Sequence, residues 1–208
     1  MAQERSEVKR AAFRVAMAGV PLEKLVFLDE CGFSLNLIRL YGWVQGGGRC
    51  HEVVPFQRGK NCSVIGAFSL SSALSLSSSS AFSNGLRALR HHLGTIKRND
   101  VEGFLEESLL PVLEAGSVLV MDNARTHHGG KIAELVEKAG CSLLYLPPYS
   151  PDLSPIELVW SWLKAQVKRM APRDNLARTE AIVQAAQLLP DHSAASFKHC
   201  GYEPPFSD

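Results

Sequence analysis

The sequence predicts a single α/β domain whose sheet is partly parallel. Three apolar runs, at residues 25–28, 118–121 and 143–146, are continuous and contain branched or aromatic side chains, which is typical of strands buried on both faces. Between the last two runs lies a helical pattern closed by Gly140, a residue that suits a helix C-terminus. Strand, helix and strand at this spacing indicate a βαβ unit with parallel strands. The length of 208 residues suits one domain.

Pro21 and a serine-rich stretch divide the chain. Residues 1–21 mix charged side chains with Ala and Val, and are predicted to form an N-terminal segment ahead of a domain at 22–208. Within that domain, residues 69–83 contain nine serines in fifteen positions, which predicts an inserted extended loop or long hairpin tip. The sequence assigns no function to this insertion.

The remaining elements follow in order between the first run and the C-terminus. Two strands of more alternating character are expected around 62–70 and 86–93, where antiparallel pairing suits them. A helix from about Asp100 to Leu110 follows, with Asn99 or Asp100 as its N-cap. After the βαβ unit, a strong helix is predicted by apolar residues that share one face: Ile156, Val159, Trp160, Leu163, Val167 and Met170.

Charge, hydropathy and cysteine content exclude several classes of protein. Lys plus Arg number 22 and Asp plus Glu number 21, and this net charge of +1 excludes a histone-like or polybasic protein. A hydrophobic content of 46% is too high for a disordered chain, and no apolar run approaches the roughly 18 residues that cross a bilayer. The N-terminus does not resemble a signal peptide. The five cysteines are odd in number and form no C-x-x-C pair, so reduced thiols and a cytoplasmic location are expected.

Three acidic residues stand next to the buried elements. Asp29 and Asp122 each follow an apolar run, and Glu157 lies just inside the helix that begins after the third run. On ideal helix geometry Glu157 sits about 100° around from Ile156, at the flank of the apolar stripe. A carboxylate in this position can face a site at the edge of the sheet.

Each acid also has a purely structural interpretation. An Asp at a strand end often starts a turn, and Ser154-x-x-Glu157 with Pro155 has the form of a capping box with Pro at the first helical position. Three carboxylates in one place repel, however, and divalent cations between them explain a shared site. Oxygen ligands favour Mg²⁺ or Mn²⁺ over zinc, and two such ions about 3.5–4 Å apart support in-line phosphoryl displacement.

Three stretches carry a specific family signal. They are VFLDE at 26–30, VMDNARTH at 120–127 and LPPYSPDLSPIELVW at 146–160, and 34 residues separate Asp122 from Glu157. These stretches and this spacing resemble the catalytic domain of DDE transposases of the mariner superfamily, in particular its bacterial insertion-sequence branch. The likeness runs from about residue 22 to 202.

The resemblance implies a fold, an activity and partners. The fold is RNase H-like, with a mixed five-stranded sheet flanked by helices, and the enzyme is a Mg²⁺- or Mn²⁺-dependent transposase and endonuclease. Asp29 would bridge two metal ions, Asp122 would hold one and Glu157 the other. Water would cut a phosphodiester at the element's end, and the freed 3′-hydroxyl would attack target DNA. The expected partners are DNA and either a second copy or a chain carrying a helix-turn-helix domain, in a bacterial, nucleoid-associated setting.

Four further residues are candidates for DNA contact or for support of the metal ligands. Asn123 and His127 match the family's D-N-x-x-x-H pattern and could orient a ligand or contact a phosphate; an Asx turn and a helix start are the structural alternatives. Lys164 and Lys168 lie on the outer flank of the helix that carries Glu157, where they could neutralise DNA phosphates or simply face solvent.

Three other conspicuous residues receive different interpretations. Glu30 is not expected to be a metal ligand, because adjacent strand residues point to opposite faces. Asp152 lies in a proline-rich turn, where a structural role is expected. Trp43 belongs to a region that in the family helps to clamp DNA or a partner subunit, and a core tryptophan is the alternative.

Two other functions stay open at this point. Family members carry helix-turn-helix modules ahead of the catalytic domain, for which residues 1–21 leave no room. This polypeptide alone is therefore not expected to recognise DNA ends, and three explanations stay open: a separate reading frame joined to an upstream one by frameshifting, a truncated copy, or a subunit whose binding domain another chain supplies. One alternative is a catalytically silent remnant that binds DNA or a partner transposase, although the intact acid set argues against it. The other is a generic RNase H-like nuclease, against which the proline-rich block argues.

Overall fold

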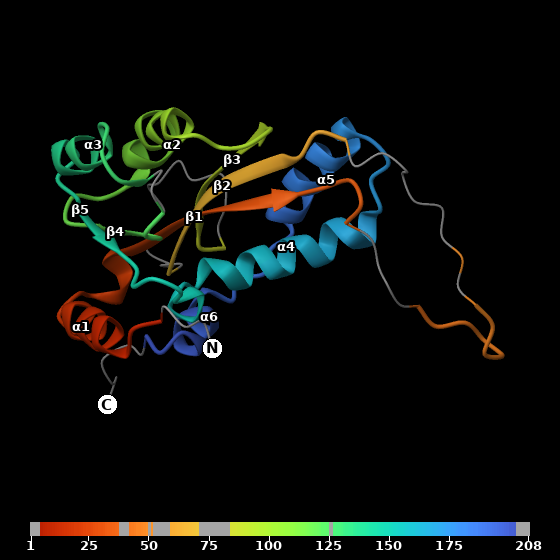
Figure 1. Cartoon of the computed structure of the whole chain (residues 1–208), viewed down its shortest axis with the longest axis horizontal. Coiled ribbons are helices and arrows are strands. Elements are labelled where there is room, and N and C mark those ends of the chain that lie inside the picture. The colour runs from red at the N-terminus through yellow and green to blue at the C-terminus, as the bar shows by residue number, and fades with distance from the viewer. Residues whose placement is uncertain are drawn as a thin grey trace.

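A mixed five-stranded sheet forms the centre of the protein (Figure 1). The computed structural model describes residues 5–37, 42–49, 51, 59–70, 84–124 and 127–202. The strand order is β3-β2-β1-β4-β5, and the strands are β1 (Leu25–Phe33), β2 (Cys62–Ser69), β3 (Leu86–Leu93), β4 (Val118–Met121) and β5 (Ser142–Tyr145). Strands β1, β4 and β5 are parallel, whereas β2 is antiparallel to both β1 and β3. The predicted mixed sheet is therefore confirmed.

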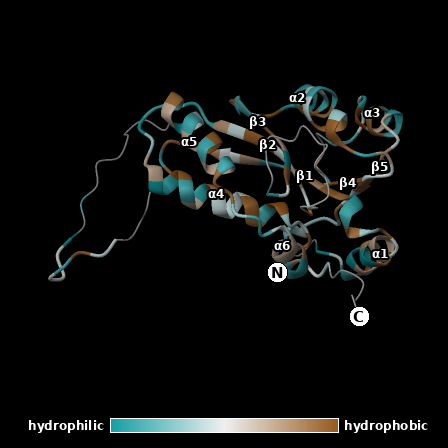
Figure 2. Cartoon of the chain, turned by 180° about the vertical axis from the view of Figure 1, so that it is seen from behind, coloured by the Kyte–Doolittle hydropathy of each residue, from teal (hydrophilic) through white to brown (hydrophobic). Residues whose placement is uncertain are grey.

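Helices cover both faces of this sheet (Figure 1). One face packs against α2 (Arg98–Phe104), its π-helical continuation Leu105–Leu109, and α3 (Ile132–Lys138). The other face packs against α1 (Glu7–Ala18), α4 (Ile156–Met170), α5 (Asn175–Gln187) and α6 (Ser193–His199). Figure 2 shows that the central strands are coloured mostly as hydrophobic, as expected for a sheet covered on both sides.

Strand β1 divides its side chains between the two layers. Phe27 and Phe33 belong to the core beneath α1, α4, α5 and α6, while Val26 and Leu28 belong to the core beneath α2 and α3. This alternation follows from the period of two in a strand. It also fixes the directions of the two acids that follow, because Asp29 takes the side of Phe27 and Glu30 the side of Leu28.

The N-terminal segment contains a helix that the sequence interpretation did not specify. Helix α1 begins after Ser6, whose side chain accepts a hydrogen bond from the Lys9 backbone N–H. Its buried residues Phe13 and Met17 belong to the same core as Phe27 of β1. The segment therefore packs on the sheet and contributes to its hydrophobic core.

Helix α2 differs from the prediction at its start. It begins at Arg98 with Lys97 as N-cap, so the predicted N-cap at Asn99 or Asp100 is wrong. The carboxylate of Asp100 still serves the helix end, because it accepts a hydrogen bond from the Lys97 backbone N–H at 2.7 Å. Most of the predicted serine-rich insertion, at 71–83, lies outside the described residues. Within the described part of the chain, no helix has the length and apolarity needed to cross a membrane.

Candidate active site

Asp29 and Asp122 lie side by side where two parallel strands separate. The parallel ladder between β1 and β4 ends at the pair Leu28 and Met121; Asp29 is the next residue within β1, and Asp122 directly follows the last residue of β4. The expectation that Asp29 ends its strand is wrong, because β1 continues to Phe33 through pairing with β2 alone. The carboxyl ends of parallel strands at such a separation are where open α/β sheets commonly place a functional site.

Asp29 is held by a tryptophan from the neighbouring helix. The indole Nε1–H of Trp160 donates to Oδ2 of Asp29 at 3.0 Å. Room for this ring comes from Gly66, which pairs with Asp29 across β1 and β2; a Cβ at Gly66 would lie 2.7 Å from the ring. The pKa of Asp29 is raised to about 7, chiefly by burial and in part by the nearby carboxylates of Glu157 and Glu30; hydrogen bonds from the Glu30 backbone and from Trp160 oppose the rise.

Asp122 is held on its other side by a buried histidine. Nδ1 of His127 lies 2.5 Å from Oδ1 of Asp122, and the Ala124 backbone N–H donates to the same oxygen at 3.1 Å. Nε2 of His127 lies 2.9 Å from Oε1 of Glu30. Burial alone would lower the pKa of His127, but hydrogen bonds to Asp122 and Glu30 outweigh it and raise that pKa to about 10. Burial opposes ionisation of Asp122, yet the contact with His127 lowers its pKa overall.

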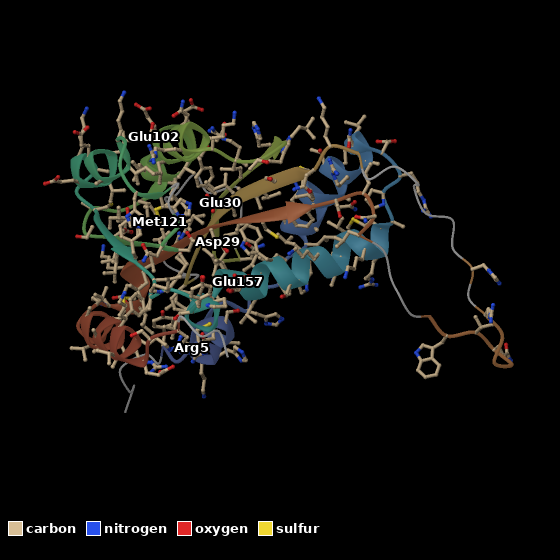
Figure 3. The ribbon with its side chains drawn as sticks, viewed as in Figure 1. Arg5, Asp29, Glu30, Glu102, Met121 and Glu157 are labelled. Atoms are coloured by element: carbon tan, nitrogen blue, oxygen red, sulfur yellow. The ribbon has the colours of Figure 1, made fainter. Side chains whose placement is uncertain are left out.

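Glu157 lies in the first turn of α4 and is exposed. Helix α4 begins at Ile156 with Pro155 as N-cap and has no side-chain hydrogen bond at that cap. The capping-box interpretation, with Ser154 as N-cap and Pro155 at the first helical position, is therefore wrong. Figure 3 shows Glu157 at the start of α4 and Asp29 on the adjacent strand β1. The glutamate is thus available for a role in the site.

The three acids line one pocket of about 400 Å³. Asn123 and the segment 146–151 line it as well. Among the described residues, no three His, Cys, Asp or Glu side chains lie close enough to form a complete metal-binding group. The donor set nevertheless fits a hard divalent cation, since it consists of carboxylate oxygens, and the Glu157 carboxylate contributes to the raised pKa of Asp29.

Residues from both ends of the chain anchor the segment that leads to Glu157. Arg10 of α1, 1% exposed, binds both carboxylate oxygens of Asp152, at 3.0 and 2.6 Å. The Tyr202 hydroxyl donates to the Leu153 carbonyl oxygen at 2.6 Å. The hydrogen bond from Arg10 is the main reason why the pKa of Asp152 is lowered. The role expected for Asp152 is a local Asx turn, whereas the structural contact found is its ion pair with Arg10.

The other predicted residues lie around the pocket or outside it. Asn123 lines the pocket, is exposed, and its Oδ1 bonds Nε2 of His128. Lys164 and Lys168 are half-buried on α4 and do not line the pocket. Trp43 is fully exposed in this chain, so the core alternative for it is wrong.

Sequence reasoning missed three contributors to the site: Glu30, Trp160 and Arg10. Trp160 was assigned to the apolar face of its helix, and only its polar indole N–H could have suggested a second function. Arg10 left no signal, because its partner Asp152 is 142 residues away. Glu30 was rightly placed on the opposite face from Asp29, but its contact with His127 depends on tertiary structure.

Comparison with known proteins agrees with this geometry. The family model for "DDE superfamily endonuclease" matches residues 24–179. The Tcb1 transposase of Caenorhabditis briggsae is 33% identical over 84 residues, which are 38% of this chain and 31% of that protein. The Mos1 strand transfer complex aligns with a TM-score of 0.65 at 16% identity, covering 97% of this chain and 57% of the Mos1 chain. The mariner Mos1 paired end complex with Mg aligns with a TM-score of 0.61 at 15% identity, covering 95% of this chain and 57% of the Mos1 chain.

These matches confirm the RNase H-like fold and the resemblance to mariner transposases, while the bacterial branch stays a prediction. This chain spans less than two thirds of each of these relatives. The family match covers most of the chain, including all three acids that line the pocket. This chain therefore belongs to the DDE superfamily endonucleases.

Proposed function

We propose that this chain is the catalytic domain of a DNA transposase that cuts and joins DNA strands with the help of divalent metal ions. The observation that carries the proposal is the shared pocket of Asp29, Asp122 and Glu157, supplied by β1, the end of β4 and the start of α4. The resemblance to Tcb1 and to the Mos1 complexes supports DNA as substrate.

The three carboxylates have distinct roles in this proposal. Asp29 would hold both ions, while Asp122 and Glu157 would hold one each. Bound Mg²⁺ or Mn²⁺ would activate the attacking hydroxyl and stabilise the leaving oxygen. Asp29 must lose its proton to act as a ligand, and the hydrogen bond from Trp160 favours that ionised form.

Surrounding residues support the ligands and the DNA. His127 orients the carboxylate of Asp122 through Nδ1, as an outer residue of a metal site commonly does. Asn123 lines the pocket rim, where its amide can contact a phosphate. Lys164 and Lys168 lie further along α4 and are proposed to neutralise phosphates of bound DNA. The proposed protein partner is a second copy of this chain or a chain that carries a helix-turn-helix domain.

Nicking of supercoiled plasmid DNA tests the proposal. We expect nicking that depends on Mg²⁺ or Mn²⁺, stops with EDTA, and falls at least about 100-fold in Asp29→Asn, Asp122→Asn and Glu157→Gln. Glu134→Gln is the matched control, because Glu134 is an exposed acid in the first turn of α3, away from the pocket.

A second assay measures joining of a 3′-hydroxyl oligonucleotide to plasmid DNA. We expect joining by the wild type and none by Asp122→Asn. Equal, background-level products from the wild type and Asp122→Asn would identify a silent remnant. Cleavage of RNA–DNA hybrids in preference to duplex DNA would identify a general nuclease.

A further inference from the structure

Strand β1 sends two neighbouring carboxylates to opposite faces of the sheet. Asp29 points toward α4 and lines the pocket, whereas Glu30 lies on the side of α2 and α3 and does not line it. Figure 3 shows both residues on β1. Glu30 therefore cannot bind an ion in this pocket directly, and its influence must pass through another residue.

His127 connects Glu30 to the pocket. The imidazole is 1% exposed, with Nε2 at 2.9 Å from Glu30 and Nδ1 at 2.5 Å from Oδ1 of Asp122. The backbone of His127 is also held, because the Tyr145 hydroxyl donates a hydrogen bond to the His127 carbonyl oxygen at 2.8 Å. A buried ring held at both nitrogens and at its backbone has little freedom to turn.

The contacts on Asp122 leave one of its oxygens for another ligand. The two contacts of the Asp122 carboxylate, with His127 and with the Ala124 N–H, converge on Oδ1, and Nδ1 of His127 also lies 3.2 Å from the Asp122 backbone carbonyl oxygen. Among the described residues, no donor occupies Oδ2. The carboxylate is therefore oriented through one oxygen while the other stays available toward the pocket.

We infer that Glu30 is a positioning residue for divalent-cation binding: through His127 it fixes the orientation of the Asp122 carboxylate. This inference rests on the proposed function, since it concerns the same pocket. The carboxylate–histidine–carboxylate chain corresponds to the outer support of metal ligands, whose loss typically weakens metal affinity about 10–100-fold.

Binding of Mn²⁺ alone, followed by electron paramagnetic resonance of the free ion, tests the inference without requiring DNA cleavage. We expect Glu30→Gln to weaken Mn²⁺ binding about 10-fold while its melting temperature stays close to that of the wild type. Glu102→Gln is the matched control, because Glu102 is a carboxylate on the same side of the sheet that accepts the Lys131 backbone N–H and lies outside the pocket.

A double-mutant cycle separates action through His127 from general loosening. If Glu30 acts through the ring, Glu30→Gln combined with His127→Gln binds Mn²⁺ no more weakly than His127→Gln alone. Additive losses, or wild-type affinity in Glu30→Gln, would overturn the inference even if plasmid nicking still depends on Asp122. Conversely, weakened Mn²⁺ binding in Glu30→Gln with no nicking by the wild type would overturn the proposed function and leave the role of Glu30 standing. Absence of Mn²⁺ binding by the wild type would overturn both.

Discussion

The indole N–H of Trp160 donates to Oδ2 of Asp29 at 3.0 Å, joining helix α4 to the strand that carries the central acid. Glu157 lies three residues before Trp160 on the same helix. This hydrogen bond thus links the helix that carries the third acid directly to the first acid. The geometry of the pocket depends on a residue that also belongs to the hydrophobic core.

Trp160→Phe keeps most of the buried ring and removes this hydrogen bond. The hydrogen bond from Trp160 lowers the pKa of Asp29, so its loss should raise that pKa. Because Asp29 must be ionised to act as a ligand, the acid limb of the pH–rate profile, where nicking falls as the pH decreases, should then move to higher pH. The free energy of unfolding should fall by about 1 kcal/mol. A pH–rate profile of plasmid nicking measures the shift.

Trp162→Phe is the control for this variant, because Trp162 lies on the same helix, is half-buried, and does not line the pocket. Its acid limb should match that of the wild type. If Trp160→Phe also keeps the wild-type profile, the indole does not tune Asp29.

Gly66→Ala tests the space that admits the Trp160 ring. The new Cβ would lie 2.7 Å from the ring, which must move, so overpacking should cost about 1–3 kcal/mol of unfolding free energy. Nicking should fall with it, since the displaced indole no longer reaches Asp29. Urea unfolding and the nicking rate at a temperature where the variant is folded are the measurements.

Gly19→Ala is the matched change for Gly66→Ala, because a Cβ at Gly19 meets nothing within 4 Å and its φ is negative. It should leave unfolding and nicking unchanged. If Gly66→Ala is as stable as the wild type, the Trp160 ring can shift away from the new methyl group without cost, and the prediction is wrong.

The buried strands and the order of elements were readable from local pattern. The runs at 25–28 and 118–121 are continuous because β1 and β4 are covered on both faces, and that continuity also located Asp29 and Asp122. The face of α4 was equally clear, because six apolar residues repeat at helical spacing.

The supporting contacts could not be read in this way, because they join residues that are remote in sequence. Glu30 meets His127 across 97 positions, and Arg10 meets Asp152 across 142. The misplaced cap at Ser154 has a local cause. The Ser-x-x-Glu pattern is compatible with a capping box, but the 3₁₀ turn Pro151–Leu153 leads into a helix that begins one residue later.

Asp29→Asn should stabilise the metal-free protein at high pH. The pKa of Asp29 is raised from 3.8 to about 7, so the unfolded chain releases this proton near pH 4 and the folded chain near pH 7. The free energy of unfolding of the wild type therefore falls as the pH rises from about 4 to about 7, because ionised Asp29 destabilises the folded protein. The Asn side chain of the variant does not ionise, so the variant avoids this loss. The gain should be on the order of 1–2 kcal/mol at pH 8 and vanish below pH 4.

Thermal unfolding of both proteins at each pH in EDTA measures this difference. His127, whose raised pKa gives stability that is lost as the pH rises toward about 10, is common to both proteins and cancels. Added Mg²⁺ should raise the melting temperature of the wild type more than that of Asp29→Asn, because only the wild type retains the full ligand set. If Asp29→Asn is less stable than the wild type at pH 8, then folding does not destabilise the ionised form of Asp29, and the prediction is wrong.

Arg10→Met should loosen the segment that precedes Glu157. Arg10 is buried and binds both oxygens of Asp152, which is half-exposed, so we expect a loss of about 2 kcal/mol rather than the larger cost of a fully buried pair. Because the turn Pro151–Leu153 leads directly into α4, nicking per folded molecule should fall as well. Arg14→Met on the exposed side of the same helix should change neither quantity. A stability loss with wild-type nicking per folded molecule would mean that α1 supports the core without controlling the position of Glu157.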